Sequence, residues 1–304
     1  MEERPPGVRR TYRRPGTGRH VAALVGVLVG FGLLAAIAFA VVGRNDDPSA
    51  SDATSSATDT TASNRVFRIV FPEGFTLDEM AGRIAAVNRI AEEEHGVTPS
   101  LRPQAYLRAT TRARGLPKEF KSLRAPHLEG FLFPATYEFT EKTTSRQLAD
   151  LQLVAFGNAW KQVNMRYARS RNLTPYDLLT IASLIEEEVV VPRERKLVSA
   201  VIYNRLAAGM PLGIDASIRY GLGIPATEPI RQSQLDSDSP YNTRLLLGLP
   251  PTPISNPGLA SLKAAARPAN VDYLYFVRKA DCKSHFFTAS QEEFDNYPRA
   301  GLQC

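Results

Sequence analysis

Three consecutive glutamates, Glu186, Glu187 and Glu188, close a helix predicted over residues 173–190 and are the first candidates for acid–base chemistry. At about 100° per residue, Glu187 lies opposite the apolar stripe and is expected to face solvent, whereas Glu186 and Glu188 lie at its two borders. A carboxyl group half-buried at such a border loses hydration, which raises its pKa and keeps a proton available. Periodicity leaves the choice between Glu186 and Glu188 open, and a charged helix end without chemistry is the alternative. The stripe is formed by Leu178, Ile181, Ala182, Ile185 and Val189.

A second group of polar residues follows the segment Tyr203-Asn204-Arg205-Leu206. Asp215 and Ser217 alternate as on one face of an extended segment, and Tyr220 follows them. Their side chains have the size and polarity to bind sugar hydroxyl or acetamido groups, and they are equally suited to cap the next turn.

Two further candidates lie in segments with aromatic residues or many prolines. Tyr241, Asn242 and Thr243 precede a Pro- and Gly-dense stretch through residue 258, which predicts a rigid loop that could present polar groups. Glu129, close to Phe131 and Phe133, could line a groove or be an ion-paired residue at a strand edge.

The folded part of the chain is expected to begin at residue 65. A β-branched and aromatic run predicts a strand over Val66–Phe71, ended by the turn Pro72-Glu73-Gly74. Thr76 with Glu79 forms a capping-box pattern that predicts a helix through about Ile90. With a second helix over 104–114, these elements predict a small strand–helix subdomain over residues 65–115.

Beyond residue 115 the pattern predicts a larger domain over residues 116–304. Thr174 followed by Pro175 is an N-cap with proline at the first helical position. Because regular alternation of strands and helices is missing, we expect an α+β fold rather than a parallel sheet. The predicted elements are helices over Ser145–Ser170, Leu173–Val190 and Arg195–Ala208 and a strand over Tyr273–Val277.

The N-terminal region has the pattern of a membrane anchor. Residues 1–20 form a basic tail with a net charge of +4, and residues 21–43 are uncharged throughout. About 20 apolar residues span a bilayer as a helix, and the positive-inside rule keeps the basic tail in the cytoplasm. A cleaved signal peptide, with Ala38-Phe39-Ala40 as its cleavage site, is the alternative. Residues 44–64, rich in Ser, Thr, Ala and Asp, predict a disordered linker.

Charge and cysteine content argue against two classes of site. Most of the net charge of +6 comes from the basic tail, so the high pI does not indicate nucleic-acid binding. The four histidines are far apart and no CxxC pair is present, so a metal site is not expected. Cys282 and Cys304 could form a disulfide if the domain lies outside the cytosol.

Several motifs, taken in order, resemble those of one enzyme family. They are LEGFLFPATY (128–137), ASLIEEE (182–188), VIYNRLAAGMPLGIDASIRYGLG (201–223), SPYNTRLLLGLPPTPISNPG (239–258) and YLYFV (273–277). Together they resemble the MltG-type (YceG-like) endolytic murein transglycosylases over about residues 65–296. The resemblance implies that residues 65–115 are a LysM-like subdomain and that residues 116–304 are the catalytic domain.

The resemblance also implies an activity and its residues. The bond between N-acetylmuramic acid and N-acetylglucosamine of peptidoglycan would be cleaved without water, leaving 1,6-anhydro ends. The family's essential glutamate matches Glu186, and Glu188 matches a supporting position. No metal or cofactor is implied, and the implied partners are glycan strands, the membrane and peptidoglycan synthases. The implied substrate-binding residues are Glu129, Glu188, Asn204, Arg205, Asp215, Ser217, Tyr220, Tyr241, Asn242 and Thr243.

This sequence departs from the family pattern at Ala135, Gly213 and Phe294. Those departures affect the details of sugar binding and leave Glu186 in place. Two other functions remain open on the residues alone: a hydrolytic muramidase, which needs a second carboxylate to activate water, and a membrane-tethered glycan-binding or scaffold protein.

Overall fold

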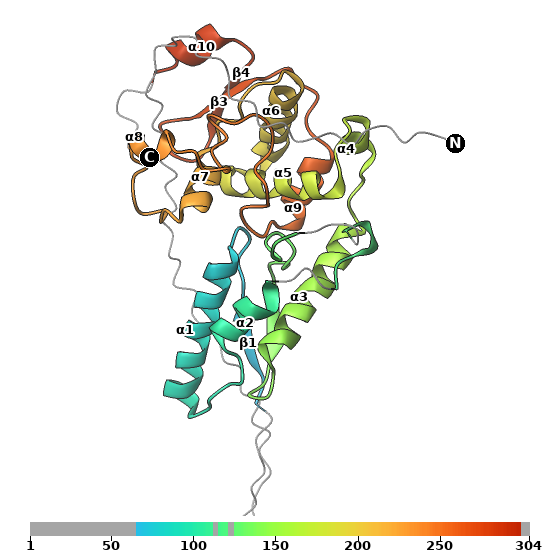
Figure 1. Ribbon diagram of the computed structural model, residues 1–304, viewed down its shortest axis with the longest axis vertical. Helices are drawn as coiled ribbons and strands as arrows, with labels where there is room; N and C mark the ends of the chain where they lie inside the picture. Colours follow the sequence, from blue (N-terminus) through green and yellow to red (C-terminus); the bar gives the residue numbers. More distant parts are fainter. Residues whose placement is uncertain (1–64, 112–114, 121–124, 299–304) are drawn as a thin grey trace, which may run out of the picture.

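The computed structural model describes residues 65–111, 115–120 and 125–298, which form two lobes stacked one above the other (Figure 1). Within those ranges no helix is long and apolar enough to cross a membrane. The basic tail, the apolar segment 21–43, the linker 44–64 and Cys304 lie outside the described residues. The anchor and the disulfide therefore stay predictions.

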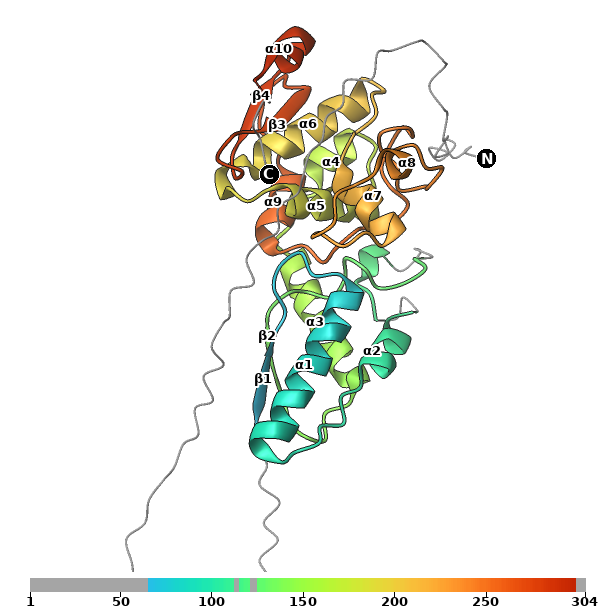
Figure 2. The ribbon, with the colours of Figure 1, turned by 90° about the vertical axis from the view of Figure 1, so that its left-hand side faces the viewer.

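The first lobe combines a two-stranded antiparallel sheet with three helices (Figure 2). The predicted strand and the Thr76–Glu79 capping box are both confirmed, with Thr76 as N-cap of the first helix. The lobe comprises β1 (Phe67–Val70), α1 (Leu77–His95), α2 (Pro103–Thr110), a 3-10 helix (Lys118–Phe120), β2 (Thr136–Phe139) and α3 (Ser145–Trp160).

The strand partner of β1 comes from well beyond residue 115. Ile69 of β1 lies opposite Tyr137 of β2, and α2 packs against both α1 and α3. The first lobe is thus completed by residues that the sequence assigned to the second domain, because β1 needs a second strand to satisfy its backbone. The description of residues 65–115 as LysM-like stays a prediction.

The single long helix predicted over Ser145–Ser170 is wrong. The chain leaves the helical path after Trp160, whose ring packs against Phe120 and Phe156. The Asn164 side chain then accepts a hydrogen bond from the Arg166 N–H at 2.9 Å and starts a separate helix, α4 (Arg166–Ser170). A short polar side chain that binds nearby backbone competes with helix continuation, which explains the break.

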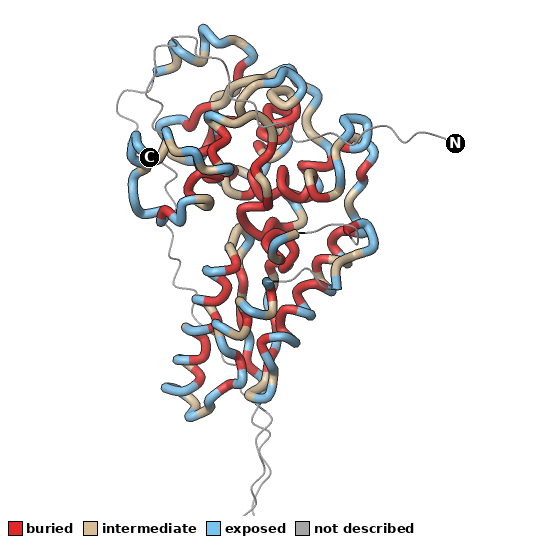
Figure 3. Tube along the Cα trace, in the orientation of Figure 1, coloured by how far each residue is buried: buried red, intermediate tan, exposed pale blue. Residues whose placement is uncertain are grey.

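The second lobe surrounds one buried helix, α5 (Pro175–Glu188), which packs against α6, α7 and α9. The N-cap Thr174 and Pro175 at the first turn are confirmed, and the middle of α5 is buried on every side (Figure 3). The other elements are a 3-10 helix (Pro192–Glu194), α6 (Arg195–Ala207), α7 (Asp215–Leu222), α8 (Gln232–Leu235), α9 (Leu259–Ala266), β3 (Tyr275–Arg278), β4 (His285–Thr288) and α10 (Gln291–Asn296).

Both sheets of the described residues are two-stranded and antiparallel. The expectation of mixed helices and small sheets, with no parallel βαβ layer, is therefore confirmed. What matters for function is the contact between the lobes, where the β1–α1 turn reaches the C-terminal end of α5.

Candidate active site

Glu186 lies at the C-terminal end of α5, at the contact between the two lobes, and is only 7% exposed. Its Oε2 accepts a hydrogen bond from the Gly258 N–H at 2.9 Å, and its Oε1 lies 3.4 Å from Nη2 of Arg195. The backbone donor comes from the Pro- and Gly-dense loop, and the cation comes from the first residue of α6. A carboxyl group held in this way has a fixed orientation, which acid–base catalysis requires.

A second carboxylate, Glu73, reaches the same place from the first lobe. Its Oε2 lies 4.0 Å from the same Arg195 nitrogen, and its side chain is 48% exposed. Burial and the charge of Glu186 raise the pKa of Glu73, while Arg195 opposes that rise. We call Glu73, Glu186 and Arg195 the acid cluster. Sequence reasoning treated Glu73 as a turn residue and did not single out Arg195, because neither has a signature in local sequence.

The turn that carries Glu73 depends on Gly74, whose φ is +85°. Its N–H donates to the carbonyl oxygen of Asn256 at 3.0 Å, which ties the β1–α1 turn to the loop before α9. A Cβ at Gly74 would lie 3.2 Å from a carboxylate oxygen of Glu187, so the left-handed backbone and the close approach both favour glycine.

The prediction that Glu187 faces solvent is wrong. Glu187 is half-buried beneath the turn at Gly74 and hydrogen-bonds with Ser255. Burial raises the pKa of Glu187 to about 8, and the neighbouring carboxylates Glu79, Glu186 and Glu188 add to the rise. Periodicity alone missed this position because the side of α5 opposite its stripe is covered by the other lobe.

Glu129 is a buried acceptor between the lobes. Its Oε2 accepts from the Leu77 N–H at 3.1 Å and the Tyr220 hydroxyl at 3.2 Å, and its Oε1 accepts from the Asn256 side chain at 2.7 Å. Burial raises the pKa of Glu129 to about 8, against the hydrogen bonds from Leu77 and Tyr220. Its hydrogen-bond partners are neutral donors, which differs from the ion-paired residue that was one of the two expectations for Glu129. Glu129 thereby joins α1, α7 and the loop before α9.

Glu188 faces a different set of residues from Glu186. Burial and the charge of Asp215 raise the pKa of Glu188 to about 7, while Arg278 and Arg244 lower it. Asp215 is itself 2.5 Å from Nε of Arg244. Residues two apart on a helix point to nearly opposite sides, so Glu188 and Asp215 form a buried ionic group away from the acid cluster.

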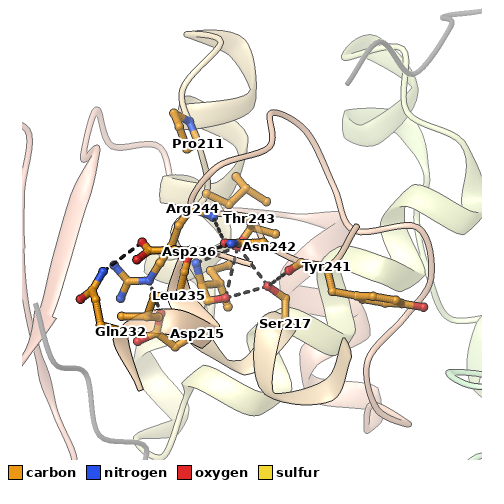
Figure 4. Close-up of polar contacts among 12 residues, drawn as sticks. Pro211, Asp215, Ser217, Gln232, Leu235, Asp236, Tyr241, Asn242, Thr243 and Arg244 are labelled. Carbon is orange, nitrogen blue, oxygen red and sulfur yellow. Dashed lines mark hydrogen bonds and ion pairs between the residues drawn. The ribbon is translucent and has the colours of Figure 1, made fainter. Parts of the chain in front are cut away.

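Asp215 and Ser217 lie in the first turn of α7, and the predicted extended segment is wrong. The chain enters α7 through Gly213, whose φ is +63°, and the Ile214 N–H donates to Oγ1 of Thr243 at 3.0 Å. The side chain of Ser217 lies 2.8 Å from the Tyr241 carbonyl oxygen and 3.0 Å from Oγ1 of Thr243 (Figure 4). The alternation of small polar residues is compatible with the first turn of a helix as well as with a strand, so this pattern could not distinguish the two.

Asn242 is fully buried beside these groups. Its Nδ2 donates to the carbonyl oxygens of Leu235 at 2.8 Å and Ser237 at 2.9 Å, and its Oδ1 accepts from the Arg244 N–H at 3.2 Å (Figure 4). We call Ser217, Asn242 and Thr243 the loop network, because their polar groups bind one another or the loop backbone.

The two tyrosines of the candidate set pair with each other instead. The rings of Tyr220 and Tyr241 meet edge to face with centroids 5.3 Å apart, and the Tyr241 hydroxyl lies 2.9 Å from Oγ1 of Thr252. Tyr241 extends away from Asn242 (Figure 4). Both tyrosines therefore lie on the Glu129 side of the lobe contact.

Asn204 and Arg205 hold the loop before β3 to the end of α6. Asn204 donates to the carbonyl oxygens of Val271 and Tyr273 at 3.0 and 2.9 Å. Arg205 donates to the carbonyl oxygens of Leu274, Pro211 and Leu212. Each side chain binds backbone, as expected of groups that fix loop positions.

The three departures from the family pattern have local roles. The carbonyl oxygen of Ala135 accepts from the Phe71 N–H at 3.0 Å, which extends the β1–β2 pairing. Gly213 has the positive φ described above, and its N–H donates to the Thr243 carbonyl oxygen at 2.9 Å. Phe294 stacks on Tyr275 with centroids 5.1 Å apart. None of the three contacts involves Glu186.

The candidate site residues predicted from the sequence therefore do not lie together in one site. Glu186 joins Glu73 and Arg195, which the sequence did not indicate, whereas Glu188 and Asp215 lie together elsewhere. An oriented carboxyl group with a backbone donor on one oxygen and a cation near the other can give up a proton and take one back.

Comparison with known proteins identifies relatives of this chain. Residues 46–300 match the YceG-like family. An endolytic murein transglycosylase of Bacillus subtilis is 33% identical over 230 residues, covering 72% of this chain and 61% of the relative. One of Streptococcus pneumoniae R6 is 34% identical over 242 residues, covering 75% and 43%.

A crystal structure of a YceG-like protein of Listeria monocytogenes superposes with a TM-score of 0.62 at 32% identity, covering 75% of each chain. The chain spans about three-fifths of the Bacillus relative and less than half of the Streptococcus relative. On the extent of the family match, this chain is a member of the YceG-like family.

Proposed function

We propose that this protein is an endolytic murein transglycosylase that cuts glycan strands of peptidoglycan with Glu186 as its acid and base. The observation that carries the proposal is the buried, oriented Glu186 at the lobe contact, held by Gly258 and Arg195. The curated relatives carry the same activity in their names, which supports the substrate class.

The reaction needs one carboxyl group and no water. Protonated Glu186 gives its proton to the glycosidic oxygen as the bond from C1 of N-acetylmuramic acid breaks, and the N-acetylglucosamine leaves with a 4-hydroxyl. The N-acetyl oxygen of the substrate stabilises the positive charge at C1. Ionised Glu186 then takes the proton of the muramyl 6-hydroxyl, whose oxygen closes the 1,6-anhydro ring. The enzyme returns to its starting protonation state.

The other candidate residues would act mainly by holding the loops around the substrate. Asn204, Arg205 and the loop network bind backbone, so they would set loop positions rather than contact sugars directly. Glu129, Tyr220 and Tyr241 would fix the lobe contact. Glu188 and Asp215 would support the far side of α5.

We further propose that residues 21–43 anchor the protein in the cell membrane, with the N-terminus cytoplasmic and the catalytic domain outside. An anchored enzyme reaches strands that are still being made, so it would terminate or trim their elongation beside peptidoglycan synthases. Protease added to intact spheroplasts should digest the folded part and spare the basic tail. Full protection of the folded part would reject this orientation.

A hydrolytic muramidase is the second candidate, and Glu73 is the observation that favours it. A half-exposed carboxylate near the acid could activate water, as the second carboxylate of glycosidases does. The two reactions differ in their products, because hydrolysis adds one water to each cut and the lytic reaction adds none.

The test is product analysis of the full-length protein acting on intact peptidoglycan. Mass spectrometry should find 1,6-anhydro ends, absent when Glu186→Gln replaces the wild type. Reducing ends one water heavier would reject the lytic reaction in favour of hydrolysis. If neither protein cuts the strands, the glycan-binding scaffold becomes the better account.

A further inference from the structure

Arg195 lies between two carboxylates that come from different lobes. One of its terminal nitrogens, Nη2, is 3.4 Å from Glu186 and 4.0 Å from Glu73. Its Nε donates to the Ser261 hydroxyl of α9 at 3.1 Å, and its side chain is only 14% exposed. The guanidinium is therefore anchored at one end, while its free end is shared between Glu186 and Glu73.

Glu73 is held against the same backbone that binds Glu186. Gly258 donates its N–H to Glu186, and a Cβ built on Gly258 would lie 1.8 Å from Oε1 of Glu73. The Glu73 carboxylate thus occupies the space that any side chain at position 258 would need. Because Gly258 has an ordinary φ of −75°, contact with Glu73 is the constraint on its side chain.

The proposed reaction makes two opposite demands on Glu186, which must be protonated before the bond breaks and ionised afterwards. We propose that Glu73 is a positioning residue that makes both states available by sharing Arg195 with Glu186. While Glu186 is protonated, Arg195 pairs with Glu73. When Glu186 has given up its proton, Arg195 pairs with Glu186. This inference rests on the proposed function of Glu186.

The surrounding charges fit this exchange. Burial and the negative charge of Glu186 raise the pKa of Glu73, and Arg195 opposes that rise, so the two carboxylates interact through space as well as through the shared guanidinium. Glu187 of α5 and Glu79 of α1 add negative charge nearby, and Arg195 is the cation paired with both carboxylates of the cluster. The Gly258 N–H holds the other carboxylate oxygen of Glu186, Oε2, at 2.9 Å.

The test measures the pH dependence of 1,6-anhydro product formation by the full-length protein. In Glu73→Gln, Arg195 pairs with Glu186 alone, so the acid loses its proton more easily. We expect the alkaline limb of the pH–rate profile to move to lower pH by roughly 0.5–1 pH unit. The shift is small because solvent screens the charge of the half-exposed Glu73. Glu73→Asp keeps the charge and should restore most of the wild-type profile. Arg195→Gln should move the alkaline limb to higher pH.

A second variant displaces Glu73 without removing its charge. Gly258→Ala pushes the flexible Glu73 side chain away while the backbone N–H stays on Glu186, so it should reproduce the shift of Glu73→Gln. Glu93→Gln, on the exposed face of α1, is the matched control. An unchanged alkaline limb in both Glu73→Gln and Gly258→Ala would overturn the proposal while leaving the role of Glu186 intact.

A readout without turnover separates this inference from the proposed function. Carboxyl carbon NMR of glutamate-labelled protein, with Glu73 assigned by its loss in Glu73→Gln, follows Glu73 directly. Its titration midpoint should fall in Glu186→Gln, where the neighbouring charge is gone. If the midpoint falls in Glu186→Gln but the wild-type protein forms no anhydro product, the proposed function fails and the coupling stands. An unmoved midpoint rejects the coupling.

Discussion

The acid cluster and the loop network are both rich in polar side chains, yet they use them differently. In the loop network, Ser217, Asn242 and Thr243 direct their polar groups at neutral partners inside the same lobe. In the acid cluster, two carboxylates from different lobes share one guanidinium, and one of them is half exposed. The loop network therefore resembles a structural core. In the acid cluster, two carboxylates face a single guanidinium at the contact between the lobes, so the negative charges outnumber the positive one.

This difference separates residues that maintain the fold from those suited to chemistry. A fully satisfied buried network makes a loop rigid, and substitution there should mainly affect stability. Like charges held close together cost stability, and such sites are candidates for function because their proton affinities are shifted. Glu188 lies with Asp215 in a buried ionic group, whereas Glu186 shares Arg195 with the half-exposed Glu73, although Glu186 and Glu188 are only two residues apart in sequence.

The largest expected effect is the loss of activity in Glu186→Gln. Strand cleavage, measured by release of soluble fragments from peptidoglycan, should fall by about 10²–10⁴-fold because the proton donor is gone. The free energy of unfolding should change by less than about 1 kcal/mol, since the amide oxygen still accepts from Gly258. Cleavage at the wild-type rate would remove Glu186 from the reaction.

The opposite result is expected in the loop network with Asn242→Ala. Loss of the amide leaves the carbonyls of Leu235 and Ser237 and the Arg244 N–H without this partner. The free energy of unfolding in urea should fall by about 2–4 kcal/mol, against little change for the exposed control Asn270→Ala. A stable Asn242→Ala protein with a raised KM would instead make Asn242 a substrate contact.

Glu188→Gln tests the buried ionic group by its pH dependence. The pKa of Glu188 is raised to about 7 in the fold, so the folded state binds a proton that the unfolded chain has released. Its stabilising contribution is therefore present below about pH 4.5 and is lost as the pH rises to about 7. Thermal melting should show the variant flattening this decline and gaining roughly 1–3 kcal/mol relative to wild type at pH 8.

If the two proteins lose stability in parallel across that pH range, Glu188 does not titrate within it. Strand cleavage by Glu188→Gln, assayed at pH 5.5, provides the companion measurement. A selective loss of turnover there would move Glu188 into the substrate-binding role implied by the family resemblance.

The smallest effect is expected for Tyr220→Phe at the lobe contact. The variant removes one hydrogen bond to Glu129 and keeps the ring packing on Tyr241. Stability should fall by about 1 kcal/mol, with KM unchanged, because the hydroxyl is used between lobes. A rise in KM without loss of stability would show that the hydroxyl contacts substrate instead.

Much of the local structure could be predicted from the sequence, because it depends on near neighbours. The starts of α1 and α5 follow from side chain–backbone hydrogen bonds within one turn, at the N-caps Thr76 and Thr174. The break after Trp160 was missed because the short polar Asn164, whose side chain accepts from the Arg166 N–H, was not interpreted as the start of a new helix. Likewise, no local pattern indicates that β1 pairs with a strand at residue 136.

For the site, the sequence by itself indicated that the glutamates at the end of α5 are candidate acids, but it set Glu187 aside on a solvent exposure that the structure does not show. Family motifs then selected Glu186. Only the tertiary structure decided which groups surround it, because Glu73, Arg195 and Gly258 come from three separate segments and meet where the lobes touch. Helical periodicity describes one helix in isolation, whereas proton affinity depends on every charge within a few ångströms, whatever its position in the chain.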